Sequence, residues 1–325
     1  MERQRELEEN IKETRMRLRR RETQRENLKG ITEELAVAQR FLSTADSLSQ
    51  AEVVRAMEAL NEEILQLTSI AADKVQVEKR QLPPDSERAK LRSQIPEWVL
   101  GPAFTDEVTL RKLDDVLAIQ IGWQAIIVSQ CSGLIHSWNF EDENISEDMD
   151  TMYKRIWSQN DQAVAGTWRS LTLGSTNDPS TKTWGDEAWI TIKEMTALPV
   201  LCGYISDEES YRELVKMFFQ RITPLLDKCL KFRRTVREGI TSMEIRPYFI
   251  ESGKPHNPLL ANLEYEDAKE DQLQEKKGIV ACSLSMGLYS VRTSRAAEGK
   301  VSRIRNVVLK PKVILQETLK EIITT

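Results

Sequence analysis

The chain of 325 residues is long enough for one large domain or two ordinary ones, and 40% of its residues are hydrophobic, which allows a sizeable core. Its formal net charge of −5 is small for this length and argues against attraction of the whole protein to nucleic acid or anionic lipid. Four cysteines, Cys131, Cys202, Cys229 and Cys282, are spread singly, which argues against a disulfide framework.

The first forty residues hold twenty charged side chains and no proline. No apolar stretch of the kind found in a secretory signal lies among them. Together with the single, widely spaced cysteines, this composition predicts an intracellular protein of the cytoplasm or nucleus.

We expect a long, solvated helix over residues 3–42 with a narrow apolar edge, here called the first seam. Its residues are Leu7, Ile11, Leu18, Leu28, Leu35 and Leu42. The same steps of four and three also reach Thr14, Arg21, Arg25, Thr32 and Gln39, so the pattern predicts a weak coiled coil with a polar middle. Gly30 costs about 1 kcal/mol relative to alanine in a helix, which favours a break or kink there.

A second helix is predicted to begin after residues 43–49, because Ser49 and Glu52 have the spacing of a capping box. Its apolar edge, the second seam, alternates between steps of four and three through Val53, Met57, Leu60, Ile64, Leu67 and Ala71. We expect the two helices to fold back as an antiparallel coiled-coil hairpin within residues 1–80. The surplus length of the first helix would then remain for a partner chain.

Residues 81–104 are rich in proline and are predicted to form a linker. Thr105, followed by two acidic residues, is expected to cap a central helix. Residues 116–140 contain no Asp, Glu, Lys or Arg and are long enough to span a bilayer. Gln120, Gln124 and Gln130 interrupt this run and would be unpaired in hydrocarbon, so we expect a buried helix and no membrane contact.

The rest of a helical body, residues 105–241, is predicted to contain helices near 147–173, 187–201 and 207–239, the last kinked at Pro224. Tryptophans at 123, 157, 168 and 189 have apolar neighbours and are expected in the core. Residues 242–325 have strand-like segments and predict a small β-rich subdomain with a C-terminal helix. Pro311 would confine the strand of residues 307–315 to an edge or bulge. The expected fold class is therefore mainly α.

No catalytic, cofactor or metal site is expected, because the chain lacks the common phosphate-binding and nucleophile motifs. The two histidines are His136 and His256. An acidic loop, Glu141, Asp142 and Glu143, follows His136, but the spacing matches no metal-ligand pattern. We interpret His136 as a helix-terminal residue that interacts with the helix dipole.

A basic patch lies on the first helix at Arg15, Arg17, Arg19, Arg20 and Arg21. Residues 1–30 contain seven glutamates against ten Lys and Arg residues, so their net charge is only +3. The sequence around the patch also departs from the basic region of leucine zippers, since Glu13 and Thr14 follow Asn10. The composition favours a solvated face with ion pairs four residues apart. Weak nucleic-acid binding or nuclear import through this patch is the alternative.

Residues 35–325 contain the phrases AVAQRFLSTADSLSQAEVVRAMEALNEEILQ and MYKRIWSQNDQAVAGTWRSL and the closing VLKPKV. In these phrases the chain resembles an uncharacterised family of coiled-coil, helical proteins from mushroom-forming fungi. The resemblance implies the same organisation of an N-terminal coiled coil and a helical body, and it implies no activity.

The C-terminal region has a turn, GKPHNP, a segment, KGIVACSLSMGLY, and the closing VLKPKV. These resemble the β-domain of GrpE-type nucleotide-exchange factors, which serve DnaK-class chaperones. The positions that match in type and order are Gly253, Pro258, Gly278, Val280, Leu284, Gly287, Leu309 and Pro311. The resemblance implies a co-chaperone role, although the helical body of residues 105–240 is foreign to that family.

The function predicted from the residues is non-enzymatic. We expect self-association, or binding of a coiled-coil protein partner, through the first and second seams. Nucleotide exchange of the GrpE type is the alternative, and nucleic-acid binding through the basic patch is a further one. No cofactor is expected.

Overall fold

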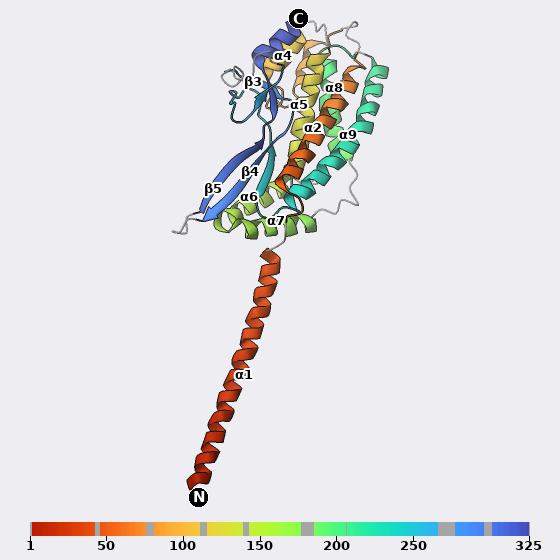
Figure 1. Cartoon of the computed structure of the whole chain (residues 1–325). Coiled ribbons are helices and arrows are strands. Elements are labelled where there is room, and N and C mark those ends of the chain that lie inside the picture. The colour runs from red at the N-terminus through yellow and green to blue at the C-terminus, as the bar shows by residue number, and fades with distance from the viewer. Residues whose placement is uncertain are drawn as a thin grey trace. The chain divides into compact units, whose positions relative to one another are not determined.

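The computed structural model describes residues 2–42, 46–75, 81–110, 116–138, 143–176, 185–205, 207–265, 277–295 and 301–324. The chain divides into two compact units, Met1–Ala45 and Asp46–Thr325. The first contains the helix α1 (Glu2–Leu42), and the second, here called the body, contains all the other described helices and strands (Figure 1). The described chain is mainly α with small C-terminal sheets, as the sequence predicts.

Helix α1 is continuous over 41 residues and runs through Gly30, so the predicted break is absent. The cost of one glycine is small beside the many good helix formers around it. Ion pairs one turn apart also support the helix, between Arg17 and Glu13 at 2.7 Å and between Lys29 and Glu33 at 3.9 Å.

Helix α2 (Gln50–Ala72) begins at the predicted capping box, in which Ser49 accepts a hydrogen bond from the amide of Glu52 and the Glu52 carboxylate accepts one from the amide of Ser49. Its apolar face is buried against α5 (Leu117–His136) and α9 (Glu208–Arg237). The prediction of a separate hairpin domain over residues 1–80 is therefore wrong, because α2 belongs to the body.

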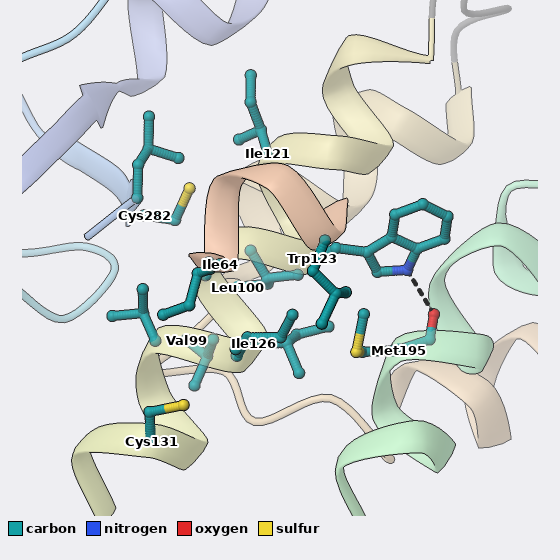
Figure 2. Packing of buried hydrophobic residues seen from close by; sticks show 14 of the residues in the cluster. Ile64, Val99, Leu100, Ile121, Trp123, Ile126, Cys131, Met195 and Cys282 are labelled. Carbon is teal, nitrogen blue, oxygen red and sulfur yellow. Dashed lines mark hydrogen bonds between the residues drawn. The ribbon is translucent and has the colours of Figure 1, made fainter. Parts of the chain in front are cut away.

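Helix α5 packs against α2, α8 and α9, and its residues Trp123 and Ile126 lie in the buried hydrophobic cluster (Figure 2). By length and composition it is apolar enough to cross a membrane, but 83% of that stretch is buried within the body, as is usual for a core helix. Trp123 on α5 is fully buried, and its indole N–H donates a 2.7 Å hydrogen bond to the carbonyl oxygen of Met195 on α8 (Gly185–Leu201). The predicted buried central helix is confirmed.

The segment predicted as a linker, residues 81–104, packs onto the core. It contains α3 (Asp85–Arg92), and the side chains of Ile95, Val99 and Leu100 are buried. Helix α4 (Pro102–Leu110) begins at Pro102, whose fixed φ suits the first helical position. Thr105 therefore lies inside α4 and does not cap the central helix.

The single helix predicted over residues 147–173 is instead two, α6 (Glu143–Gln159) and α7 (Gln162–Thr176). The break falls at Asn160, whose side-chain amide donates to the carbonyl of Ile156 at 2.9 Å and so competes with the helical backbone. Helices α8 and α9 lie where the sequence predicts them, and α9 is uninterrupted at Pro224. Trp189 is 49% exposed, so its predicted place in the core is wrong.

The C-terminal strands form two three-stranded sheets. One has the order β1 (Glu244–Tyr248), β4 (Gly287–Arg295), β5 (Val301–Leu309), and the other has the order β2 (Asn262–Leu263), β6 (Lys312–Leu315), β3 (Val280–Ser283). Pro311 separates β5 from β6, so the predicted single strand is two strands in different sheets, and β6 is central. Helix α11 (Gln316–Thr324) follows, as predicted.

The strands share one hydrophobic core with the helices. Ile245, Cys282, Leu288 and Ile314 belong to the same buried cluster as α2, α5 and α9. The predicted boundary at residues 241–242 therefore does not separate two compact units.

A buried carboxylate in the body makes its stability depend on pH. Glu194 on α8 is buried and accepts a 2.9 Å hydrogen bond from the side chain of Gln130, and burial raises the pKa of Glu194 to about 7. Between pH 4.5 and 7, the carboxyl of Glu194 is therefore protonated in the folded state and ionised in the unfolded state. This contribution to stability is present below pH 4.5 and is lost as the pH rises through 7.

Replacing Glu194 with Gln should stabilise the body at pH 8 by roughly 1–3 kcal/mol relative to the wild type, because the buried charge is removed. The difference should shrink toward pH 5. Urea unfolding at both pH values measures it, with Glu209→Gln, at an exposed position of α9, as the matched control. An equal effect of Glu194→Gln at pH 5 and pH 8 would contradict the prediction.

Candidate functional site

The first seam is exposed wherever the structure describes its side chains. Leu18, Leu28 and Leu35 are each more than half exposed. The side chains of Leu7, Ile11 and Leu42 lie outside the described residues, although their backbone is helical. These three side chains are therefore uncovered in the single chain, and their use in association stays a prediction.

Ile31 also belongs to this apolar edge and is missing from the predicted set. It is 54% exposed. From Leu28 onward the apolar positions follow steps of three and four through Leu28, Ile31, Leu35, Ala38 and Leu42. The signal was present as a change of phase at Leu28, where a three-residue step replaces the expected four.

The second seam is not an association surface. Val53, Met57, Leu60, Ile64 and Leu67 are at most 5% exposed and form part of the main core. A heptad pattern requires an apolar neighbour but does not say which one, and here α5 and α9 supply it. The predicted use of these five residues for association is therefore wrong.

The basic patch lies on the exposed surface of α1. Arg15, Arg17, Arg19, Arg20 and Arg21 are all exposed. Arg17 donates to the carboxylate of Glu13 one turn earlier, as expected of a solvated face with ion pairs.

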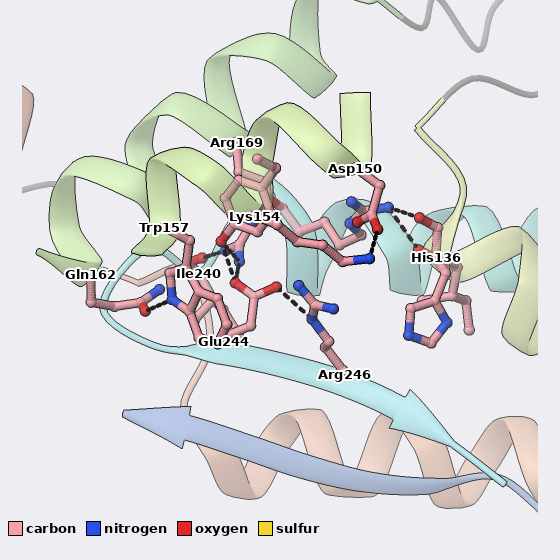
Figure 3. A network of polar contacts seen from close by, with 12 residues as sticks. His136, Asp150, Lys154, Trp157, Gln162, Arg169, Ile240, Glu244 and Arg246 are labelled. Atoms are coloured by element: carbon pink, nitrogen blue, oxygen red, sulfur yellow. Dashed lines mark hydrogen bonds and ion pairs between the residues drawn. The ribbon is translucent and has the colours of Figure 1, made fainter. Parts of the chain in front are cut away.

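A buried polar network joins α6, α7 and β1 (Figure 3). Glu244 on β1 forms an ion pair with Arg169 on α7 and accepts a 2.5 Å hydrogen bond from the hydroxyl of Tyr153 on α6. Its second oxygen accepts a 3.0 Å hydrogen bond from Nε of Arg246. Burial opposes the charge of Glu244, but Arg169 and Arg246 hold its pKa below the usual range.

Two further arginines bind the C-terminal end of α5. Arg237 on α9 donates to the carbonyls of His136 and Ser137, and Arg233, one turn earlier, donates to Ser137 at 3.0 Å. The last carbonyls of a helix have no partner within it, and the negative end of the helix dipole attracts cations. Arg237 also lies over the ring of Trp138, 4.5 Å from its centroid. Burial lowers the pKa of Arg237 to about 9, which leaves it charged at neutral pH.

His136 is the last residue of α5, and it is neutral at pH 7. Burial, followed by the charges of Arg237 and Arg246, lowers its pKa to about 4. Its Nδ1 lies 2.8 Å from the carbonyl oxygen of Ser132, which can only accept, so the proton is on Nδ1 and Nε2 is an acceptor. The predicted position of His136 at the end of the helix is confirmed, and the cation beside the last carbonyls is Arg237.

A cleft of about 480 Å³ opens where α5 ends beside α6, α9 and β1. Its polar lining includes His136, Asp150, Arg237, Glu244 and Arg246. Asp150 accepts a 2.6 Å contact from Lys154, so this carboxylate already has a cationic partner. Ile135, Trp138, Ile245 and Pro247 supply apolar wall. Strand β1 is at the edge of its sheet, which accommodates Pro247 because proline has no N–H to donate.

The sequence prediction missed this network. The sequence indicates it only by a charged residue at a position where the helical spacing predicts an apolar one. On α9, this spacing of four, three and four residues runs through Ile222, Leu226, Cys229 and Arg233. A long charged side chain at such a position usually extends to solvent. Arg233 and Arg237 are instead buried, and their partners lie about 100 residues away in the chain.

Among the described residues, no group of three or more His, Cys, Asp or Glu side chains is arranged to hold a metal ion. The side chains of the acidic loop, Glu141, Asp142 and Glu143, lie outside the described residues. All four cysteines are buried free thiols.

The segments that resemble the GrpE-type β-domain lie together in the body. Strand β3 pairs with β6, and Pro255 forms a bridge with Ile279. A Cβ atom at Gly287 would lie 2.4 Å from the ring of Pro311, so these two matched positions need a residue without a side chain at 287.

Comparison with protein-family models, with curated proteins and with solved structures finds no match for this chain. The resemblances to the fungal helical family and to the GrpE type therefore stay predictions. Function is inferred below from two features of the chain itself, the exposed apolar edge of α1 and the cleft at the end of α5.

Replacing Glu244 with Gln should lower the free energy of unfolding by about 3–5 kcal/mol, because it leaves Arg169 buried without an opposite charge. Urea unfolding measures the change. The matched control is Glu251→Gln, which breaks an exposed ion pair with Lys254 and should cost at most about 1 kcal/mol. Equal losses in the two variants would contradict a special role for the buried carboxylate.

The imidazole of His136 should titrate with a midpoint near pH 4 in an NMR experiment, with His256→Gln used to assign the two histidine signals. A depressed pKa means that the unfolded state takes up the proton first, so stability is complete above pH 6.5 and falls as the pH drops to about 4. His136→Gln should flatten that part of the stability profile. A midpoint near 6.5 would show that the side chain is not desolvated.

Proposed function

We propose that the protein self-associates through α1, so that a coiled coil brings copies of the body together. The observation that carries this proposal is that α1 forms a compact unit of its own as a single helix whose described seam side chains are more than half exposed. A regular apolar edge on an otherwise charged helix gains stability when a second helix covers it.

The size of the apolar edge sets the strength of association. Full burial of a Leu or Ile side chain is worth about 1.5–3 kcal/mol, so covering the exposed half of Leu18, Leu28, Ile31 and Leu35 yields roughly 1 kcal/mol each. Two chains then gain roughly 8 kcal/mol from these four positions. Because association itself costs roughly 4–15 kcal/mol, we expect a reversible, concentration-dependent oligomer rather than a permanent one.

The charge pattern favours the C-terminal half of α1 as the part of the helix that contributes most to association. Arg21 and Arg25 occupy seam positions, and identical charges would face one another there in a parallel, in-register pair. Arg17 and Glu22 flank the seam at positions where a parallel pair forms ion pairs between chains. After the change of phase at Leu28, the apolar positions continue without a gap through Ile31, Leu35, Ala38 and Leu42, so this segment should contribute most.

Leu18→Glu combined with Leu28→Glu in the full chain should abolish the oligomer, because two carboxylates enter the seam of each helix. Light scattering after size exclusion measures the mass, and thermal unfolding checks that the body is intact. The matched control is Lys12→Gln with Arg19→Gln, which changes the charge by the same amount on the opposite face of α1.

The control should keep the oligomer of the wild type. An unchanged mass in the Leu18→Glu, Leu28→Glu variant would overturn the proposal. A wild-type chain that stays monomeric at high concentration would overturn self-association. The exposed apolar edge would then be a binding surface for a different protein.

A further inference from the structure

We propose that the cleft at the end of α5 binds a small hydroxylated carboxylate. In this arrangement the guanidinium of Arg246 takes the carboxylate and Nε2 of His136 accepts a hydrogen bond from the hydroxyl. This site is independent of the association proposed for α1, since all its residues lie in the body.

Charges of both signs surround the cleft, and they are not all paired with one another. Arg169, Arg233 and Arg237 are buried, whereas Glu244 is the buried carboxylate of the network. Arg169 and Arg246 share Glu244, and Arg233 has a carboxylate partner in Glu238 at 3.9 Å. Arg237 donates to the neutral carbonyls of His136 and Ser137. Arg237 lines the cleft and forms no ion pair with a described residue. A buried cation without a paired carboxylate is costly, so an anion bound beside Arg237 would stabilise this part of the body.

Arg246 is the group best placed to bind that anion. Its side chain is 21% exposed, lies in the cleft, and uses Nε for Glu244. Its terminal nitrogens make no hydrogen bond to any residue that the structure describes, and Figure 3 shows the guanidinium between Glu244 and the His136 side of the cleft. A guanidinium fork matches the two oxygens of a carboxylate.

His136 determines the second group that the ligand must carry. Its neutral ring, with the proton on Nδ1, presents an acceptor at Nε2, and an acceptor needs a hydroxyl or amine donor on the ligand. A hydroxyl on the ligand supplies that donor without adding a charge to the cleft.

The lining also limits the charge of the ligand. Glu147, Asp150 and Glu244 all line the cleft, so phosphate, which is partly a dianion at neutral pH, would be repelled more than a singly charged carboxylate. The apolar wall formed by Ile135, Trp138 and Ile245 suits the carbon chain of such a molecule.

NMR of the two histidines tests the proposal in the full chain at pH 7 and constant ionic strength. The probes are glycolate, which has a carboxylate and a hydroxyl, acetate, which lacks the hydroxyl, and inorganic phosphate. Glycolate should shift the His136 signal saturably, acetate should bind at least fivefold more weakly, and phosphate should bind more weakly than glycolate. The His256 signal should not move, which makes it an internal control.

Arg246→Gln should weaken glycolate binding at least tenfold, and Arg246→Lys should weaken it several-fold, because lysine keeps the charge but loses the fork. The matched control is Arg292→Gln, an exposed arginine of the same sheet, which should bind as the wild type does. Thermal unfolding checks each variant, and Arg246→Lys serves if Arg246→Gln does not fold.

Three results would each overturn the proposal. They are the absence of a saturable shift of His136 with glycolate, equal or tighter binding of acetate or phosphate, and unchanged glycolate binding in a folded Arg246 variant.

Discussion

Helix α5 ends inside the body, where its last carbonyl groups have no partners in the helix and accept hydrogen bonds from Arg233 and Arg237. Satisfying those carbonyls brings two cations into a region of low dielectric. The same region contains Arg169 and Glu244, whose ion pair ties α7 to β1. The cleft, the neutral state of His136 and the positions of α6, α7 and β1 around it all follow from how this helix end is buried.

Different interactions stabilise the two compact units. The body is held by a core that α2, α5, α8, α9 and the strands share, with Trp123 and Met195 in contact across its centre. About half of the residues of helix α1 are charged, and the helix is supported within itself by helix propensity and by ion pairs one turn apart. Its apolar edge is too narrow for a core of its own and wide enough for a second helix. Association and ligand binding are therefore proposed for separate units.

Much of the fold could be predicted from local patterns. The capping box at Ser49, the apolar run of α5 and the helical spacing of α9 each placed a helix correctly, because these signals depend on neighbours in the sequence. Local sequence does not show which element covers an apolar stripe. The sequence therefore predicts association through the second seam, although α5 and α9 cover it. The site was missed for the same reason, since Arg169, Arg237 and Glu244 meet only when α7, α9 and β1 pack together.

We propose that copies of the chain associate through α1 and that the body folds without α1. The most direct measurement compares the solution mass of the full chain with that of residues 46–325 over a range of protein concentrations. The full chain should reach a multiple of its own mass as concentration rises, and residues 46–325 should remain folded and monomeric throughout. The same oligomeric state in both proteins would contradict the account.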